Sequence, residues 1–307
     1  MKYRILIILC VFPLVNIKGQ KGMATDSINV VGWLNEARKQ PSSTCLPIFF
    51  AEKLIGKPYV AHTLEINERE KLVVNTRQLD CTTLVENVVA LTCAFKRGNG
   101  SFKDYKYYLN IIRYRNGRNT GYVSRLHYFT EWIDDNSRKG IVAERQQPNP
   151  PFSAVQTIKL GYMSTHPNSY KALRNNPALV DGIAKMEQAY CGRKYRYIPK
   201  AAVKNTTAMR KAVKDGDIIA ITCKKKGLDI AHLGIALWKK DGLHLLNASQ
   251  IHEKVVLEKM TLGKYLAQHP SHTGIRIIEI LYIKQKSYGI TRFYEFCQQV
   301  FTIRLCR

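Results

Sequence analysis

Hydrophobic residues recur at the spacing of one helix face in the stretch that follows Asp80. They are Leu84, Val88, Leu91 and Phe95. Asp80 is a residue type favoured at helix N-caps, and Lys96-Arg97-Gly98 supplies a cationic last turn followed by a stop. The pattern predicts an amphipathic helix whose first residue is Cys81.

The rest of the pattern predicts helices in the first two thirds of the chain and strands in the last third. Helices are expected at 26–57, 105–132 and 181–190, a short strand at 72–75, a loop at 148–151 and irregular backbone at 199–213. Residues 217–283 alternate in polarity and are rich in β-branched side chains, which indicates an antiparallel sheet. The expected fold class is α+β.

The sequence DIAHLGIALW around His232 alternates as a strand, and a Lys-Lys-Asp-Gly turn signal follows it. If Trp238 pairs with Leu243 of the next strand, His232 lies opposite Ser249 and one diagonal step from Asn247. Asn247 is then within reach of the imidazole. A single bulge would change this pairing.

Cys81 at a helix start is a chemically distinctive position. Unpaired backbone N–H groups and the positive end of the helix dipole favour thiolate over thiol. The alternatives are a small buried side chain, as expected for Cys93, or half of a disulfide. His232 offers a base and Asn247 an amide that holds the imidazole in one tautomer, which is the Cys-His-Asn logic of papain-like catalysis. A purely structural histidine is the alternative for His232.

The chain begins with the pattern of a secretory signal. Residues 1–4 are basic, residues 5–15 are apolar, and the small Gly19 follows. The apolar run is too short for a comfortable membrane span. We expect residues 1–19 to be removed and the mature protein to be exported to the periplasm of a Gram-negative bacterium.

Removal of Cys10 with the signal leaves an odd number of cysteines. They are Cys45, Cys81, Cys93, Cys191, Cys223, Cys297 and Cys306. At least one thiol is free if the others pair, and a disulfide between Cys297 and Cys306 stays open. No pair has CxxC spacing and no histidine pair flanks one, so we predict no metal site and no cofactor.

The formal net charge of +25 in 307 residues raises the question of a nucleic-acid partner. The basic residues are spread along the chain, and no helix-turn-helix, zinc-finger or RNA-binding aromatic motif accompanies them. We therefore expect no nucleic acid. An anionic envelope surface or a carboxylate-bearing substrate suits an exported basic protein, and a merely solvated basic surface is the alternative.

Four motifs taken in order resemble those of the NlpC-type papain-like cell-wall hydrolases. They are Gly56-Lys57-Pro58-Tyr59, Asp80-Cys81-Thr82-Thr83-Leu84-Val85, His232-Leu233-Gly234-Ile235-Ala236 and Asn247-Ala248-Ser249. The resemblance implies a papain-like core with the nucleophile Cys81 at a helix N-terminus packed on an antiparallel sheet. It also implies that His232 is the base and Asn247 its orienter, a position often occupied by histidine in that superfamily.

Further segments resemble the branch called N-acetylmuramoyl-L-alanine amidase-like. They are Asn75-Thr76-Arg77-Gln78-Leu79-Asp80-Cys81, Arg125-Leu126-His127-Tyr128-Phe129 with Trp132, Tyr197-Ile198-Pro199 and Gly274-Ile275-Arg276. The similarity runs from about residue 50 to 283. It implies a single hydrolase domain over 20–284 with a largely helical insertion at about 100–200, and a tail at 285–307 beyond it.

That branch implies hydrolysis of the amide between N-acetylmuramic acid and L-alanine in muropeptides, the small fragments of peptidoglycan turnover. Substrate contacts are then expected from Tyr59, Arg77, Arg125, His127, Tyr128, Trp132 and Ser249. A structural role is an equal alternative for these side chains. Two other functions stay open: an endopeptidase of the same fold that cuts between D-glutamate and a diamino acid, and a non-catalytic wall- or anion-binding protein.

Overall fold

The helix predicted after Asp80 lies at the centre of the structure. In the computed structural model, which describes residues 17–281, helix α3 spans Cys81–Lys96. The Asp80 carboxylate accepts the Thr83 backbone N–H at 2.8 Å, and the Thr83 hydroxyl accepts the Asp80 N–H at 2.9 Å. This reciprocal capping box fixes the first turn. The predicted helix is confirmed, including Cys81 as its first residue.

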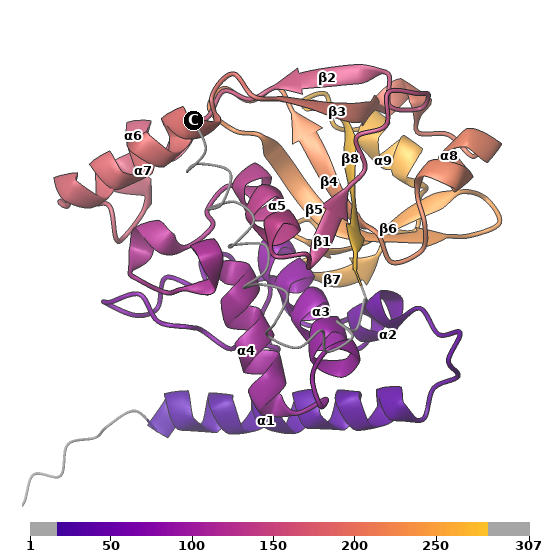
Figure 1. The fold of residues 1–307 in the computed structure, drawn as a ribbon. Helices are drawn as coiled ribbons and strands as arrows, with labels where there is room; N and C mark the ends of the chain where they lie inside the picture. Colours follow the sequence, from indigo (N-terminus) through magenta and orange to yellow (C-terminus); the bar gives the residue numbers. More distant parts are fainter. Residues whose placement is uncertain (1–16, 282–307) are drawn as a thin grey trace, which may run out of the picture.

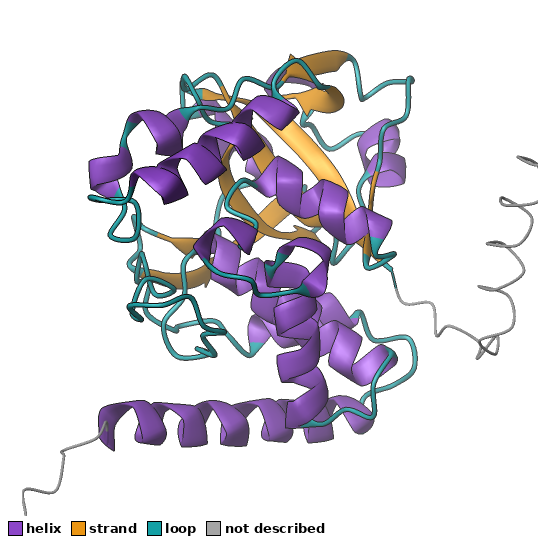
Figure 2. Ribbon diagram, turned by 60° about the vertical axis from the view of Figure 1, so that its left-hand side comes forward, coloured by secondary structure: helices purple, strands orange, loops and turns teal. Residues whose placement is uncertain are grey.

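The other helices lie mostly on one side of a sheet (Figure 1). They are α1 (Ile17–Arg38), α2 (Leu46–Glu52), α4 (Phe102–Arg113), α5 (Phe129–Arg138), α6 (Tyr162–Thr165), α7 (Pro177–Tyr190), α8 (Thr207–Ala212) and α9 (Leu262–Ala267). Short 3₁₀ turns are η1 (Arg115–Gly117), η2 (Tyr122–Ser124), η3 (Pro167–Ser169) and η4 (Lys200–Ala202). Figure 2 shows most of the helices on one side of the sheet, with α1 along the base of the molecule.

The sheet has eight strands within the described residues, all paired antiparallel. They are β1 (Val142–Glu144), β2 (Ala154–Thr157), β3 (Lys194–Pro199), β4 (Ile218–Cys223), β5 (Ile230–Trp238), β6 (Leu243–Ser249), β7 (Lys254–Leu257) and β8 (His272–Ile280). The strand order is β2-β3-β8-β4-β5-β6-β7, with β1 on β8. The expected α+β class is confirmed.

Both faces of the central strands are covered. Every residue of β4 is buried. Ile218 and Ala220 pack with α1 to α5, whereas Ile219 and Ile221 pack with α8 and α9. Because alternate side chains of a strand point to opposite faces, β4 needs apolar residues at consecutive positions. The first of these cores holds α3 against β5.

The pairing of β5 with β6 follows the predicted register, from Trp238 opposite Leu243 to Ile235 opposite Leu246. Gly234 comes next along β5. A Cβ atom there would lie 2.6 Å from the Leu246 carbonyl oxygen. The glycine therefore allows β6 to approach β5 closely at this position.

Other predictions differ from the structure, among them that of irregular backbone at 199–213, which contains η4 and the helix α8. The helix predicted at 26–57 is two helices, α1 and α2, because Pro41 follows the first and the chain turns before the second. Residues 72–75 form neither a strand nor a helix. The stretch 105–132 is divided into α4, two 3₁₀ turns and α5, and residues 118–128 wrap around a pocket rather than continuing a helix.

The predicted insertion at about 100–200 contains α4 to α7 but also β1, β2 and β3, so it extends the sheet as well as adding helices. Residues 1–16 of the predicted signal and the tail at 285–307 lie outside the described residues, as do Cys297 and Cys306. Over residues 17–281, no helix is long and apolar enough to cross a membrane.

Candidate active site

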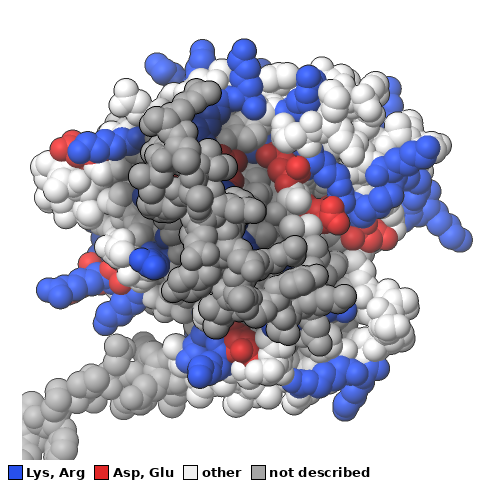
Figure 3. All heavy atoms as spheres, in the orientation of Figure 1, with Lys and Arg blue, Asp and Glu red and all other residues white. Residues whose placement is uncertain are grey.

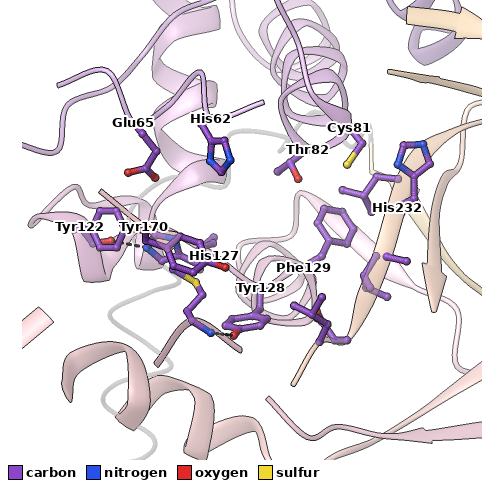
Figure 4. A pocket seen from close by; sticks show the side chains of 17 residues that line it. His62, Glu65, Cys81, Thr82, Tyr122, His127, Tyr128, Phe129, Tyr170 and His232 are labelled. Atoms are coloured by element: carbon purple, nitrogen blue, oxygen red, sulfur yellow. Dashed lines mark hydrogen bonds between the residues drawn. The ribbon is translucent and has the colours of Figure 1, made fainter. Parts of the chain in front are cut away.

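Cys81 lies where the start of α3 meets an open edge of β5. Pairing with β6 begins only at Ile235, so the preceding residues of β5 are unpaired on that side. The backbone N–H of Leu233 is close enough at this edge to lower the pKa of the Cys81 thiol, against the larger effect of burial. Figure 4 shows Cys81 and His232 next to each other at the wall of one pocket. The helix start and the strand edge thus bring a thiol and an imidazole together.

His232 is held by the next strand. Its Nε2 lies 2.9 Å from the Oδ1 of Asn247, which is fully buried. An amide oxygen only accepts, so we assign the ring hydrogen to Nε2 and leave Nδ1 as the basic nitrogen. This is the contact that the predicted register implied. Asn247 holds the tautomer in which His232 takes a proton through Nδ1.

Asn247 is itself oriented by Glu258. The amide Nδ2 donates to Glu258 Oε1 at 2.9 Å, and Glu258 is 5% exposed. The other carboxylate oxygen lies 3.4 Å from Nε2 of His252, whose side chain is half-exposed. Since a carboxylate cannot donate, the amide must turn its nitrogen toward Glu258 and its oxygen toward His232.

The protonation states differ from the expectation of a thiolate. Burial, followed by the negative charge of Asp80, raises the pKa of Cys81 to about 12. Burial also lowers the pKa of His232, against the opposing effect of its bond to Asn247. At neutral pH the pair is a thiol and a neutral imidazole. The helix dipole is outweighed because the cap of the same helix is a carboxylate beside a desolvated sulfur.

A pocket of about 200 Å³ opens from this pair. It runs between the loop after Tyr59 and the segment 118–128, with Cys81 and His232 at one end and Glu65 at the other (Figure 4). Its walls are rich in aromatic rings, and these are Tyr122, Tyr128, Phe129 and Tyr170. A concave, largely apolar site beside a nucleophile and a base is the usual arrangement of an enzyme active site.

A comparison with protein families supplies an independent finding. The model of the AmiA-like family, described as N-acetylmuramoyl-L-alanine amidase-like, matches residues 49–275, which include Cys81, His232 and Asn247. The chain belongs to the N-acetylmuramoyl-L-alanine amidase-like family. Membership implies a peptidoglycan-type substrate and is in keeping with a hydrolase. No curated protein matched the chain.

Solved structures agree with this family. An N-acetylmuramoyl-L-alanine amidase from Bacteroides uniformis is 39% identical over 76% of this chain and 97% of its own, with a TM-score of 0.71. A Bacteroides fragilis protein described as a candidate xylanase is 39% identical over 75% of this chain and 99% of its own, with a TM-score of 0.70. A Legionella pneumophila protein, 19% identical over 85% of this chain and 96% of its own, has a TM-score of 0.64 and shows the fold alone.

Three predicted substrate contacts of this amidase-like chain lie at the site. Tyr59 lies close to Cys81. Burial raises the pKa of the Tyr59 phenol, and the nearby Cys81 and Asp80 raise it further. A bridge between Tyr59 and Leu79 holds it beside the start of α3. His127 and Tyr128 line the pocket. These three side chains are placed where a substrate could meet them.

The other four predicted contacts, like Tyr59, are not among the pocket-lining residues. Arg77 pairs with Asp26 of α1 at 3.2 Å, and Arg125 is buried behind the pocket wall against Glu65.

Trp132 is fully buried and stacks on Phe129 with ring centroids 4.8 Å apart, and the Ser249 hydroxyl accepts the His252 N–H at 3.3 Å. Each of these four side chains already has a structural partner or is enclosed by the core. We therefore do not propose Trp132, Ser249 or the two arginines as direct substrate contacts.

Three carboxylates that no motif of the sequence indicated lie at or beside the site: Glu65, Asp229 and Glu258. The register of β6 and β7 would have indicated Glu258. Asn247 pairs with Val256, so residue 258 is its diagonal neighbour on the same face. Glu65 carried no comparable signal because it lies in a loop.

The positively charged side chains of the protein do not gather at one place on the face shown in Figure 3. Lysine and arginine side chains are spread around the described part of that face, with a few aspartates and glutamates between them. None of the described residues that line the pocket is a lysine or arginine. The positive charge of the chain therefore does not extend into the described lining of the pocket.

Proposed function

We propose that the protein is a cysteine-dependent N-acetylmuramoyl-L-alanine amidase with a papain-like core of the NlpC type. The observation that supports it most is the 2.9 Å bond between His232 Nε2 and Asn247 Oδ1, made by a histidine that lies next to Cys81. This is the geometry of a nucleophile, a base and an orienter. Family membership supplies the bond that is cut.

In the first step, Nδ1 of His232 removes the proton of the Cys81 thiol as the sulfur attacks the lactyl carbonyl carbon. The neutral pair suits this order, because the imidazole is free to accept a proton and the thiol still carries one. The backbone N–H of Cys81 and the hydroxyl of Tyr59 are the proposed donors to the oxyanion. A donor of this kind contributes about 2.7 to 4 kcal/mol to transition-state stabilisation.

In the second step, His232 returns the proton to the nitrogen of L-alanine, the C–N bond breaks, and the peptide leaves as an amine. The sugar half remains as a thioester on Cys81. His232 then takes a proton from water, the hydroxide oxygen attacks the thioester, and the thiol is restored with release of the free lactyl acid. One water is consumed for each amide bond broken.

We also propose that the protein acts in the periplasm on small turnover fragments. The basic start and apolar run of residues 1–15 support export. Fractionation of cells that make the full chain tests this: the processed protein is expected in the periplasmic fraction, and an unprocessed cytoplasmic protein would contradict it.

Digestion of a defined set of muropeptides by the mature protein tests the function. Mass analysis is expected to find the muramoyl sugar and the intact peptide as separate products. Cys81→Ala is expected to lower the rate by at least about 10³-fold, because the covalent route is lost. Cys191→Ala, which removes an exposed cysteine, is the matched control.

Other products would point to other functions. A cut within the peptide, after D-glutamate, would support the endopeptidase. An unaltered digest, with biological activity retained by Cys81→Ala, would support a non-catalytic binding protein. Glycoside hydrolysis, which the name of the Bacteroides fragilis protein suggests, commonly uses two carboxyl groups beside the scissile bond. Here Glu65 is paired with Arg125, and Asp229 accepts a helix N–H, so we do not propose it.

A further inference from the structure

Three aromatic side chains pack in a row next to His232, outside the pocket lining. They are Tyr265 of α9, His269 in the turn after α9, and His272 at the start of β8, and we call them the ring stack. None of the three lines the pocket that opens from Cys81. They come from a single short stretch of chain between α9 and β8, and they contact the base from a different element than Asn247 does.

Tyr265 lies on the same side of the sheet as His232. Alternate side chains of a strand point to one face, so His232 shares its face of β5 with Ala236. Ala236 packs in the core cluster that also contains Tyr265. The ring centroids of His232 and Tyr265 are 6.5 Å apart with 26° between the planes, within the range of offset aromatic contacts. Tyr265 is only 9% exposed, so its ring has little room to move.

Two histidines hold the ring of Tyr265. The His269 ring lies 4.4 Å from it between centroids, and Nδ1 of His269 donates to the Tyr265 carbonyl oxygen at 2.7 Å. His272 is nearly parallel to His269, with centroids 4.7 Å apart and 9° between the planes. The backbone N–H of His272 also donates to the His269 carbonyl oxygen at 3.0 Å. The stack is therefore fixed by both ring contacts and hydrogen bonds.

The hydrogen bond to Asn247 does not by itself fix the plane of the His232 ring. It holds one atom, Nε2, and leaves the imidazole able to turn about that contact. Proton transfer from Cys81 requires Nδ1 to stay directed at the sulfur, and a displacement of about 1 Å at a reacting group costs about 10²-fold in rate. A ring packed beside the imidazole restricts this turning.

The histidines near the base also oppose one another's protonation. Burial lowers the pKa of His232, and His269 acts on it in the same direction. Burial, followed by His269, His232 and Lys200, lowers the pKa of His272 to about 4. A proton on one imidazole therefore disfavours a proton on its neighbours. This favours the neutral form of His232, which is the form that accepts the proton of the thiol.

The remaining groups around His232 are acidic or uncharged. Three of them raise its pKa, and these are Asn247 through its hydrogen bond and Glu258 and Asp80 through their charges. Tyr265 adds no charge, because burial, followed by Glu258 and Cys81, raises the pKa of its phenol to about 12. Exclusion of water by the ring stack therefore counteracts the carboxylates, which would otherwise favour the imidazolium.

We propose that Tyr265 is a positioning residue for His232, and that His269 and His272 hold Tyr265 in place. The proposal rests on the proposed function, because it assigns a second support to the base of that reaction. Tyr265 acts through the face of its ring, since its hydroxyl has no hydrogen-bond partner in residues 17–281. The stack acts on kcat through the base and leaves substrate binding unchanged.

Kinetics on a muramoyl peptide test the proposal. Tyr265→Leu keeps an apolar side chain but loses the flat ring, so kcat is expected to fall by about 10- to 100-fold, with KM changed by less than about threefold. Tyr265→Phe retains the ring and is expected to keep kcat within about threefold of the unaltered protein. Tyr107→Leu, at a tyrosine of α4 that is 59% exposed, is the matched control.

Three results would overturn the proposal. They are an unchanged kcat in Tyr265→Leu, equal losses in the leucine and phenylalanine variants, and a rise in KM with kcat unchanged. The last result would make Tyr265 a substrate contact rather than a support for the base.

NMR of isotope-labelled histidines tests the same point without substrate. In Tyr265→Leu the pKa of His232 is expected to rise toward the ordinary value of about 6.5, because water reaches the ring. Ring-carbon relaxation is expected to show new motion of His232. His269→Asn keeps a donor for the Tyr265 carbonyl but removes a charge, and it is expected to raise the pKa of His232 as well. His166→Asn, at an exposed histidine after α6, is the matched control.

His269 is only partly buried, so His269→Asn also serves if Tyr265→Leu does not fold. An unchanged pKa of His232 in the folded variants would overturn the proposal. If the unaltered protein leaves the muramoyl–alanine bond uncut, the proposed function fails, while the NMR titration still reports whether Tyr265 supports His232. If the bond is cut and the variants behave like the unaltered protein, the proposed function stands and the role of Tyr265 fails.

Discussion

Asn247 donates its amide hydrogen to Glu258 at 2.9 Å and accepts from His232 with the oxygen of the same amide. The two contacts are linked, because an amide turned by one partner is turned for the other. Glu258 thus acts on His232 through Asn247, without touching the reacting atoms. It is a positioning residue for the base.

The effect of substituting Glu258 is expected to depend on whether the new side chain can still accept the hydrogen bond from Asn247 Nδ2. Glu258→Ala is expected to reduce kcat by about 10- to 100-fold, because a hydrogen bond to a buried charged group is lost and the amide is free to turn. Glu258→Gln is expected to retain most activity, since its amide oxygen still accepts from Asn247. Kinetics on a muramoyl peptide and the ¹⁵N shifts of His232, which report the tautomer, check this.

Glu279→Ala is the matched control for Glu258→Ala. Glu279 lies on β8, pairs with Arg145 and is about half-exposed. Retention of the Nε2–H tautomer and of full activity in Glu258→Ala would show that the amide is oriented without the carboxylate.

Gly234→Ala tests the close approach of β5 and β6. The new Cβ would lie 2.6 Å from the Leu246 carbonyl oxygen and 2.7 Å from a methyl carbon of Leu245. We expect a loss of about 1–3 kcal/mol in the free energy of unfolding. Activity is expected to fall by about 100-fold because the strands that carry His232 and Asn247 are displaced. Gly32→Ala is the control: nothing lies within 4 Å of its Cβ position. Equal melting curves for the two variants would contradict the prediction.

Asp80→Asn tests how the cap affects the nucleophile. Asparagine is as good an N-cap as aspartate, so α3 keeps its start, while the charge that raises the pKa of Cys81 is removed. The rate of alkylation of Cys81 by iodoacetamide at pH 8 is expected to rise by up to about tenfold. Mass mapping assigns the label, and Cys81→Ala should lose it. An unchanged or slower rate in Asp80→Asn would show that the charge does not restrain the thiol.

The pH dependence of kcat/KM is expected to have an acid limb and a broad plateau. Burial lowers the pKa of His232, so activity should rise with pH as the imidazole loses its proton, with a midpoint below its ordinary value of about 6.5. Because the thiol has a pKa of about 12, it stays protonated through the plateau. A bell-shaped profile that falls near pH 8 to 9 would instead indicate a thiolate–imidazolium pair.

Much of the site followed from local patterns. The α3 start at Cys81 was predictable because Asp80 and Thr83 make their capping contacts within one turn. The contact of His232 with Asn247 was predictable because a short turn sets the register of a hairpin. Both relationships depend on residues close together in the chain, where spacing determines geometry.

Other features depended on the tertiary structure. Arg125 and Trp132 are residue types that often contact sugars and carboxylates. In this structure both are buried, and Arg125 pairs with Glu65 instead. The pKa of Cys81 is raised because packing of α3 against β5 removes water from the sulfur, an effect that the helix pattern does not contain.

The sequence by itself determined the helix that begins at Cys81, the hairpin of His232 and Asn247, and the antiparallel sheet, because each arises from periodicity, capping and turn chemistry acting over a few residues. Only the tertiary structure decided that Glu258 orients the amide, that the thiol is neutral, and that Asp229, His127 and Glu65 line one pocket with no lysine or arginine among the described residues around it. Those properties come from desolvation and from contacts between segments far apart in the chain, and no local pattern specifies either.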